Sequence, residues 1–406
     1  MGEGATRVEA RSMVPLFVVA GTMTLGYGSI YTLLADLRDR FGFSESQLGL
    51  IVAAGFFAGF CAQLFLSRYG DRGHVTLMVR GGVLLAALAM LGSAIATEFW
   101  QFMLARLLLG LGSGTVSPAI RRVVVTRDPD HVGNNLGHLS SVEVTGFVIG
   151  PLLAAAAAET FGIRAPFVLL AAVMVGVLAM SSRLDLTVGA GSGARRVIRS
   201  LLRSNVLKAT LAASVAFYVT VGMFEAVWAV LLHDQGAETW LIGLTLSLFT
   251  VPMIFLAPIG GRTAQRRGPL RVVTVSLAVA TLCTFSYGVL PGLWVLLAVS
   301  MVHAVADSFT MPGNQVAIAM ASPPEQMSAA QGLLGATGLI TAGLTGLIAG
   351  WLYEEGGRLA VSATTAAVMV VFLTTARVLG RTRKEEVELI GLEPTTSSMP
   401  WRRSTN

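Results

Sequence analysis

The chain has 406 residues, of which 54% are hydrophobic and only 13% are charged, and its mean hydropathy is +0.70. Soluble domains carry about 25% charged residues, so this composition excludes an ordinary soluble protein. The formal net charge of +6 would suit a nucleic-acid-binding protein. That class is excluded too, because the basic residues lie almost wholly in the segments on one side of a series of apolar runs.

Residues 1–13 are polar, and the apolar run that follows is too long for the core of a cleavable signal peptide. Twelve apolar runs each approach the roughly 20 residues that cross about 30 Å of hydrocarbon as a helix. Backbone groups in hydrocarbon must be hydrogen-bonded within their own segment, so we expect every run to be an α-helix. The predicted spans are 14–35, 46–67, 75–95, 98–119, 138–159, 164–182, 208–231, 240–261, 271–290, 293–314, 329–352 and 359–379.

The basic residues predict the orientation of these spans. Alternate connecting segments hold nearly all the Lys and Arg, and the remaining ones hold only Arg38, Arg40, Arg164 and Arg358. Because cytoplasmic loops carry the excess of Lys and Arg, we expect both termini in the cytoplasm and the protein in the inner or plasma membrane as a multi-pass protein.

The longest internal connection, residues 183–207, divides the spans into two sets of six. We therefore expect a six-helix bundle over residues 14–182, a cytoplasmic central loop, and a second six-helix bundle over residues 208–379. The central loop contains a Gly- and Ser-rich stretch typical of flexible linkers. Residues 380–406 are expected to form a disordered cytoplasmic tail.

The two halves repeat each other. The polar interruption Ser67–His74 contains Asp71-Arg72, and a similar one, Gly261–Gly268, contains Gln265-Arg266 at an offset of 194 residues. Pro118 and Pro312 lie at the same offset. A chain built from two parallel six-helix halves encloses a transport pathway on the pseudo-two-fold axis between them. The sequence thus predicts an all-α membrane protein made of two pseudo-symmetric bundles.

Two glycine patterns accompany this repeat. Arg106 is followed by Gly110 and Gly114 in the fourth span, and Gly146, Gly150 and Pro151 lie in the fifth. Small residues at such spacings let membrane helices approach closely. We expect both patterns to be helix-packing motifs.

These motifs and the twelve-span plan resemble the major facilitator superfamily of secondary transporters over residues 12–380. The stretch Gly146–Pro151 is similar to a family signature associated with exporters that work as antiporters. The resemblance implies alternating access and proton-coupled export of small organic, drug-like compounds. It implies no cofactor beyond the proton gradient as energy source.

The repeated polar interruptions are predicted cytoplasmic gating residues. A carboxylate and a guanidinium at helix ends, here Asp71 and Arg72 with Gln265 and Arg266 as their counterparts, can join the two halves and hold one face shut. The alternative is a charge cluster that only sets topology. We expect Asp71→Asn to slow transport and Gln265→Ala to have little effect.

Ionisable side chains within the spans are candidate proton-coupling or central polar residues: Glu225, Asp307, Glu143, Arg106 and His303. Placing each of these side chains in charged form at the centre of a span costs a free energy of at least about 2.5–3.5 kcal/mol. Such residues therefore indicate a function or a compensating partner. A carboxyl group in a low-dielectric site can bind and release a proton near neutral pH, as a reversible carrier must. The alternative is a fixed ion pair, such as Arg106 with an acid on a neighbouring helix.

Aromatic residues near the middle of the two equivalent first helices are candidate substrate-lining residues for amphipathic organic molecules. They are Tyr27, Tyr31, Tyr218 and Trp228. The alternative for each is packing against lipid or core. Weaker polar candidates are Gln63, Asn314, Gln315 and Gln331.

Other functions stay open at this point. The same architecture would suit an importer or facilitator for a sugar, organic acid or amino acid, or a non-transporting receptor. An enzyme is not expected, because the chain has no zinc-protease or serine-hydrolase motif and its five histidines are scattered. Cys61 and Cys283 are expected to pack as small apolar residues without metal. The predicted partners are a small-molecule substrate and the lipid bilayer, with no nucleic acid, and a monomer should suffice.

Overall fold

The computed structural model describes residues 13–30, 37, 40–43, 45–188, 197–237 and 239–389, and its regular elements are helical throughout this part of the chain. In chain order the α-helices are α1 (Val14–Gly28), α3 (Glu45–Phe65), α4 (Val75–Ile95), α5 (Phe99–Arg127), α6 (Val132–Phe161), α7 (Ala165–Ser182), α8 (Val197–Leu201), α9 (Asn205–Asp234), α10 (Thr239–Arg267), α11 (Pro269–Val289), α12 (Leu293–Ala321) and α13 (Met327–Leu389). The predicted all-α fold is confirmed.

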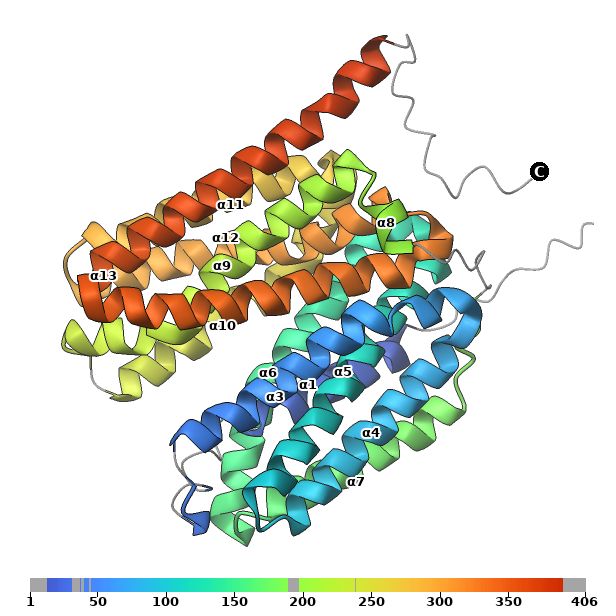
Figure 1. The fold of residues 1–406 in the computed structure, drawn as a ribbon, viewed down its shortest axis with the longest axis vertical. Helices are drawn as coiled ribbons and strands as arrows, with labels where there is room; N and C mark the ends of the chain where they lie inside the picture. Colours follow the sequence, from blue (N-terminus) through green and yellow to red (C-terminus); the bar gives the residue numbers. More distant parts are fainter. Residues whose placement is uncertain are drawn as a thin grey trace, which may run out of the picture.

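Each predicted span lies largely on one of these helices. The element α13 contains the last two spans, because its backbone leaves the helical conformation at Gly357, where φ is +63°. Figure 1 shows α13 turning back on itself at this point. Eight described helical stretches are long and apolar enough to cross a membrane, and Val14–Gly28 and Leu50–Phe65 are shorter apolar helices. The protein is a multi-pass membrane protein.

Several helices are longer than their predicted spans. Helix α5 has 29 residues and α6 has 30, so each is about 45 Å long at 1.5 Å per residue. That exceeds the roughly 30 Å of hydrocarbon. The predicted fourth span ends at residue 119, whereas α5 continues to Arg127. Hydropathy detects only the part of a helix that lies in hydrocarbon, so it misses the polar turns beyond.

Two predicted flexible regions are only partly described. In the central loop the structure describes a short helix, α8, while residues 189–196 lie outside the described part. Helix α13 continues to Leu389, so the start of the predicted disordered tail is helical. That stretch is rich in Lys, Arg and Glu, which are good helix formers. Residues 390–406 lie outside the described residues.

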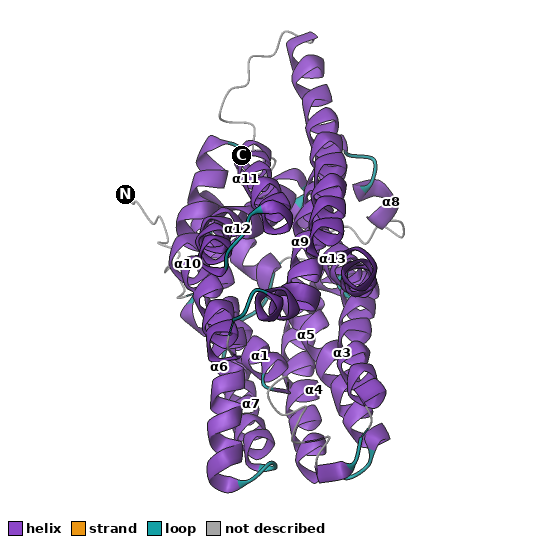
Figure 2. Ribbon diagram, turned by 90° about the vertical axis from the view of Figure 1, so that its left-hand side faces the viewer, coloured by secondary structure: helices purple, strands orange, loops and turns teal. Residues whose placement is uncertain are grey.

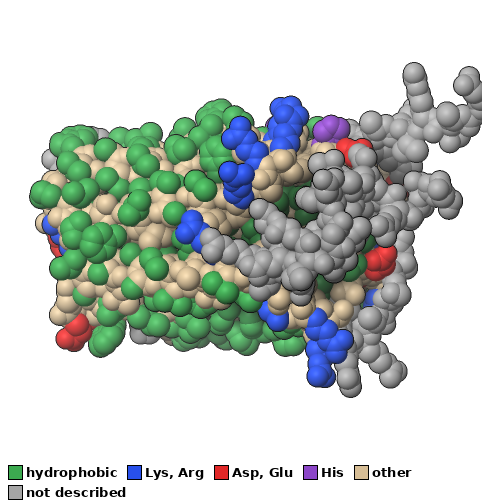
Figure 3. All heavy atoms as spheres, turned by 90° about the horizontal axis from the view of Figure 1, so that it is seen from above, with side chains coloured by type: hydrophobic (Ala, Val, Ile, Leu, Met, Phe, Trp, Pro, Cys, Tyr) green, Lys and Arg blue, Asp and Glu red, His purple; other side chains and the backbone are tan. Residues whose placement is uncertain are grey.

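The helices pack in two groups, with α1 and α3–α7 in one and α9–α13 in the other (Figures 1 and 2). In the first group α3 and α4 pack on α5, α1 packs on α6 and α4 packs on α7. In the second group α9 packs on α13, while α10 and α11 pack on α12. In Figure 3 apolar side chains cover much of the outer surface, above all on the left of the view. Most of the visible Lys and Arg lie to the right of this apolar part. A bilayer-facing surface has this character.

One end of the molecule joins the two groups. We call it the Asp71 end; it holds the turns at residues 65–75, 127–132, 267–269 and 321–327. The other end, which holds Gly357, is called the Gly357 end. At the Asp71 end α6 crosses α10 and α3 lies along α13.

The α6–α10 crossing brings backbone against backbone. A Cβ atom on Gly133 would overlap the carbonyl oxygen of Gly261, and a Cβ on Gly261 would overlap that of Gly133. One turn further, a Cβ on Gly137 would lie 2.5 Å from the carbonyl oxygen of Ala257. Only glycine permits this approach, so these positions set how closely the two groups meet.

Candidate functional site

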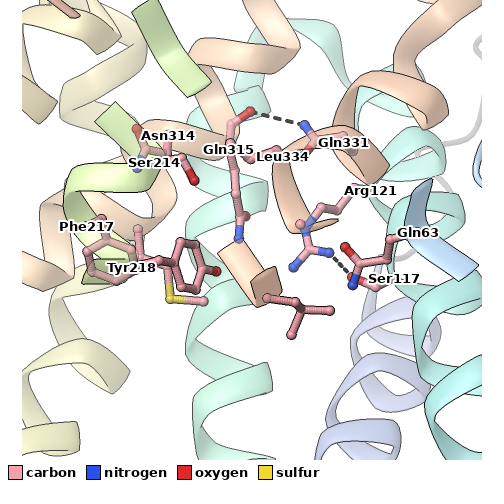
Figure 4. A pocket seen from close by; sticks show the side chains of 13 residues that line it. Gln63, Ser117, Arg121, Ser214, Phe217, Tyr218, Asn314, Gln315, Gln331 and Leu334 are labelled. Carbon is pink, nitrogen blue, oxygen red and sulfur yellow. Dashed lines mark hydrogen bonds between the residues drawn. The ribbon is translucent and has the colours of Figure 1, made fainter. Parts of the chain in front are cut away.

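A polar cavity of about 100 Å³ lies between the two groups towards the Asp71 end (Figure 4). Helices α3, α5, α9, α12 and α13 form its walls. Pockets for drug-sized ligands have about 300–1,000 Å³, so in this conformation the cavity has room only for a few water-sized groups. Its polar side chains are Gln63, Ser117, Arg121, Ser214, Tyr218, Asn314, Gln315 and Gln331.

An ion pair between Arg121 and Glu143 lies beside this cavity. The Nη2 atom of Arg121 is 2.9 and 2.8 Å from the two carboxylate oxygens of Glu143, and the Nη1 atom donates to Ser117 Oγ. Their side chains are only 14% and 11% exposed. Glu143 is therefore held in an ion pair in this conformation. Sequence reasoning misses Arg121 as a site residue because the predicted span ends at residue 119.

Three buried side chains around the cavity have hydrogen-bonding atoms without a partner among the described residues. They are Ser214 Oγ, both amide atoms of Asn314, and Gln331 Oε1. The amide nitrogen of Gln331 donates to the carbonyl oxygen of Gln315 at 3.1 Å, while Ser140 Oγ donates to Gln315 Oε1 at 3.2 Å. An unsatisfied buried polar group costs about 1–3 kcal/mol. These atoms thus mark a place suited to water or to polar groups of a ligand.

Arg106 lies inside the first group of helices and is only 1% exposed. Its Nη1 atom donates to the carbonyl oxygen of Tyr27 at 3.1 Å, and its guanidinium carbon lies 4.3 Å from the centre of the Tyr27 ring. Gly55 in α3 leaves room for the Arg106 side chain, since a Cβ there would lie 3.0 Å from Nε. Tyr27 therefore covers Arg106 and binds it through both its ring and its backbone.

Glu225 is exposed on α9. Its carboxylate is close enough to interact electrostatically with Tyr27 in α1 and with Tyr218 on its own helix. The side chain therefore faces the other group of helices.

His303 and Asp307 form part of a buried polar cluster inside the second group. Asp307 Oδ2 lies 3.7 Å from His303 Nε2, the Tyr287 hydroxyl lies 3.0 Å from His303 Nδ1, and Thr220 Oγ1 lies 3.4 Å from Nε2. Asp307 is 3% exposed, and its Oδ1 atom has no hydrogen-bond partner among the described residues. The predicted pairing on one helix face is thus present, between α9, α11 and α12.

The predicted aromatic residues do not form one set. Tyr218 lines the cavity, and Figure 4 shows Tyr218 and Arg121 pointing towards each other across it. Trp228 is 1% exposed, stacks on Phe224 at 4.4 Å between ring centres, and donates to a threonine hydroxyl of α10. In this conformation Trp228 packs in the core of the second group and does not line the cavity. Core packing was the alternative to its predicted substrate-lining role. Tyr31 lies outside the described residues.

Asp71 joins the two groups at the Asp71 end. Its two carboxylate oxygens accept hydrogen bonds from the backbone N–H groups of Ser328 and Ala329, each at 2.8 Å. Those N–H groups begin α13, where a negative charge is favoured by the helix dipole. Asp71 also forms an ion pair with Arg122 of α5, which donates to the carbonyl oxygen of Pro324 at 3.1 Å.

Arg72, which the sequence predicts as a gating residue together with Asp71, takes no part in that contact. Arg72 is exposed, with its guanidinium carbon 5.4 Å from the centre of the Tyr69 ring. Arg122 pairs with Asp71 instead, and it lies three residues beyond the end of the predicted fourth span at residue 119. Arg266 is likewise exposed on α10. The guanidinium that pairs with Asp71 in this conformation thus comes from Arg122 of α5.

Gln265, the counterpart of Asp71, makes the equivalent contact from the second group. Its Oε1 atom accepts from the backbone N–H of Gly133 at 2.6 Å, and its Nε2 atom donates to the carbonyl oxygen of Asp130 at 2.8 Å. Gly133 lies in the first turn of α6 as Ser328 lies in that of α13. We call these two contacts the Asp71 latch and the Gln265 latch.

The turn that Gln265 contacts is braced by Asp128. One carboxylate oxygen of Asp128 lies 2.9 Å from His131 Nδ1, and the other accepts from Asn135 at 3.0 Å. Burial tends to raise the pKa of Asp128, but its hydrogen bonds to His131 and Asn135 outweigh that and hold the pKa below its usual range. The carboxylate is therefore ionised at neutral pH and fixes the start of α6.

Gln265→Ala is now expected to slow transport by a few-fold, a revision of the negligible effect expected from sequence. The change removes two neutral hydrogen bonds between the groups, each contributing about 0.5–1.5 kcal/mol. Initial transport rates in reconstituted vesicles would test this, with Gln265→Glu as the variant that keeps an acceptor for the Gly133 N–H. A rate equal to that of the unchanged protein would show that this contact does not stabilise the conformation.

The glycine pattern in the fourth span packs α5 against α3. A Cβ on Gly110 would overlap the carbonyl oxygen of Gly55, and a Cβ on Gly114 would lie 2.6 Å from that of Gly59. These contacts lie within the first group, so they hold one bundle together and do not join the two.

The pattern in the fifth span packs α6 against α1. A Cβ on Gly146 would overlap the carbonyl oxygen of Gly21, and one on Gly150 would overlap that of Leu25. Pro151 lies inside α6, which continues as a helix to Phe161. Both glycine stripes therefore bring helix backbones together within the first group.

A model of the Major Facilitator Superfamily matches residues 16–241 and 210–403. Multidrug resistance protein MdtG of Enterobacter lignolyticus (strain SCF1) is 25% identical over 278 residues, which cover 66% of each chain. The protein of that name from Salmonella typhimurium is 25% identical over 284 residues, covering 66% of this chain and 69% of its own. The chain thus spans about two thirds of the length of these curated relatives.

Solved structures share the fold. The human organic anion transporter MFSD10 (TETRAN) superposes with a TM-score of 0.73 at 16% identity, covering 90% of this chain and 98% of that one. A Major Facilitator Superfamily transporter, FucP, in the outward conformation, superposes with a TM-score of 0.74 at 15% identity and the same coverage. At such identities the likeness concerns the fold alone.

Proposed function

This chain belongs to the Major Facilitator Superfamily of membrane transporters, and from this premise we propose that it exports small organic, drug-like compounds by alternating access in exchange for protons. In this proposal residues 14–182 rock against residues 208–379 as two bundles. The pathway between them opens in turn to either side of the membrane. A single chain carries both bundles, so a monomer suffices.

One observation carries the alternating-access proposal: the contacts between the two groups gather at the Asp71 end. Several hydrogen bonds between described residues of the two groups lie there, as do the glycine crossings of α6 with α10. The bonded pairs are Asp71 with Ser328, Asp71 with Ala329, Arg122 with Pro324, Gly133 with Gln265, Asp130 with Gln265 and Ser140 with Gln315. A transporter closed to one side of the membrane would hold its two bundles together in this way.

The excess of Lys and Arg in the segments at the Asp71 end favours a cytoplasmic location for that end. The conformation described here is then closed to the cytoplasm. Export as the direction is supported by the relatives named as multidrug resistance proteins and by the stretch Gly146–Pro151. The opposite direction, uptake together with protons, would appear in vesicles as accumulation of substrate on the side into which protons flow.

Proton coupling is supported by the buried carboxyl group of Asp307, whose negative charge would need a compensating positive charge or a proton. Asp307 is buried beside neutral polar groups, and an uncompensated charge at such a place is costly. A carboxyl group that is loaded with a proton in one conformation and unloaded in the other couples the gradient to the motion. The gradient supplies roughly 2.3 kcal/mol per charge per 100 mV, which shifts the balance between two conformations by about 50-fold.

Asp307→Asn is expected to reduce gradient-driven dye extrusion from vesicles by at least about tenfold, because a permanently neutral side chain cannot cycle a proton. Extrusion should be measured with an imposed pH gradient and again after a protonophore collapses it. Thr310→Ala is the matched control on the same helix, since among the described residues Thr310 Oγ1 bonds only to Ser276 and a backbone carbonyl. Extrusion that survives the protonophore, or an Asp307→Asn variant with full coupling, would contradict the mechanism.

A further inference from the structure

Helix α9 presents one continuous face to the proposed pathway. Ser214 and Tyr218 on this face line the cavity. Glu225 follows Tyr218 by seven residues, which is two helical turns, so it lies on the same face about 10 Å nearer the Gly357 end. The position of Glu225 on α9 therefore directs its carboxylate into the pathway and away from lipid.

Glu225 is exposed, and its carboxylate lies within electrostatic reach of two phenol groups. The residue is exposed, whereas Asp307 and Glu143 are buried. Among the described residues no hydrogen bond or ion pair engages it, and the groups within electrostatic reach are the phenols of Tyr27 and Tyr218. These two rings come from different groups of helices, so a ligand between them would contact both.

The two basic residues nearest these rings, Arg106 and Arg121, are each engaged by other groups of the protein. Arg106 is 1% exposed, and the Tyr27 ring covers its guanidinium at 4.3 Å. Arg121 lies 2.8 Å from a carboxylate oxygen of Glu143 and is largely buried. A ligand between α1 and α9 therefore meets a Glu225 carboxylate that no hydrogen bond or ion pair engages among the described residues, whereas the charge of Arg121 is already paired with Glu143.

We infer that the substrates of this transporter are organic cations with an aromatic or apolar body, which bind with their charge at Glu225 and their body against Tyr27 and Tyr218. A carboxylate attracts the charge, and phenol rings add cation–π attraction of about 0.5–2 kcal/mol. An organic anion would instead face the Glu225 carboxylate. The inference rests on the proposed function, because it assigns a substrate class to the same pathway.

Two ions of nearly the same shape and opposite charge provide the test: tetraphenylphosphonium and tetraphenylborate. Their binding to the purified full-length protein would be measured by isothermal titration without any gradient. We expect tetraphenylphosphonium to bind at least about tenfold tighter, which corresponds to about 1.4 kcal/mol. The net charge of +6 would by itself favour the borate, so such a preference cannot come from overall charge.

Glu225→Gln should remove this preference, and Glu225→Asp should keep most of it. The matched control is Glu355→Gln, which neutralises an exposed acid beside the turn at Gly357 and should leave both affinities unchanged. Equal affinities for the two ions, tighter binding of the borate, or an unchanged preference in a Glu225→Gln protein that elutes as a folded monomer would each overturn the inference. Cation preference without gradient-driven extrusion would refute only the export proposal.

Discussion

Gly133→Ala is expected to shift the protein away from the conformation described here and to slow transport. The added Cβ would overlap the carbonyl oxygen of Gly261, and a backbone atom cannot rotate away as a side chain can. The two groups of helices must separate at the Asp71 end to relieve it. Overpacking of this kind costs about 1–3 kcal/mol, which corresponds to roughly a 5–150-fold change in the balance between conformations.

Spin-label distances would detect that shift. Labels at Arg183→Cys and Arg267→Cys, both exposed at the Asp71 end, report the separation of the two groups once Cys61 and Cys283 are replaced. The matched control is Gly176→Ala, because a Cβ there would meet nothing within 4 Å. If Gly133→Ala left the distance distribution and the transport rate unchanged, the α6–α10 crossing would not limit closure.

Asp71→Asn is expected to slow transport at least about tenfold while leaving substrate affinity within a few-fold of its original value. The change removes the negative charge from the start of α13 and leaves Arg122, which is 2% exposed, without its carboxylate partner. Removal of one partner from a buried ion pair costs about 3–5 kcal/mol. The penalty applies to the conformation in which the latch is formed, so the population of that conformation falls.

Rates of substrate movement and equilibrium binding should be measured on the same Asp71→Asn preparation. Arg72→Gln is the matched control, since it changes the adjacent charge without touching the latch. An equal loss in Asp71→Asn and Arg72→Gln would indicate that the charges only set topology. We expect the Gln265 variants to lie between these two, because the Gln265 latch lacks a charge.

The sequence repeat predicts the positions of the two latches but not their chemistry. The offset of 194 residues identifies Asp71 and Gln265 as counterparts, and the structure places both at the first turn of a helix in the opposite group. Their chemistry differs, because one is a carboxylate with a buried arginine and the other a neutral amide. The two contacts at the Asp71 end therefore differ in strength, and we expect the Asp71 latch to contribute more stability than the Gln265 latch.

The prediction of the site from sequence was less complete. Sequence reasoning identified Glu143 and His303 with Asp307 as polar groups within the spans, but it could not identify Arg121 as the partner of Glu143 or Arg122 as the partner of Asp71. Those partners come from another helix. Trp228, a predicted lining residue, packs inside the second group. In a soluble protein the apolar stripe of a helix would have shown which face points inward.

The sequence by itself determined the class of this protein, its helices and its duplication. Those features follow from the length of apolar runs and from the need to satisfy backbone hydrogen bonds in hydrocarbon. The tertiary structure alone decided which face of each helix meets its neighbours, which charges pair, and at which end the two groups of helices are joined. Lipid is as apolar as leucine, so hydropathy cannot distinguish a lipid-facing side chain from a buried one. Only the packing of the helices does.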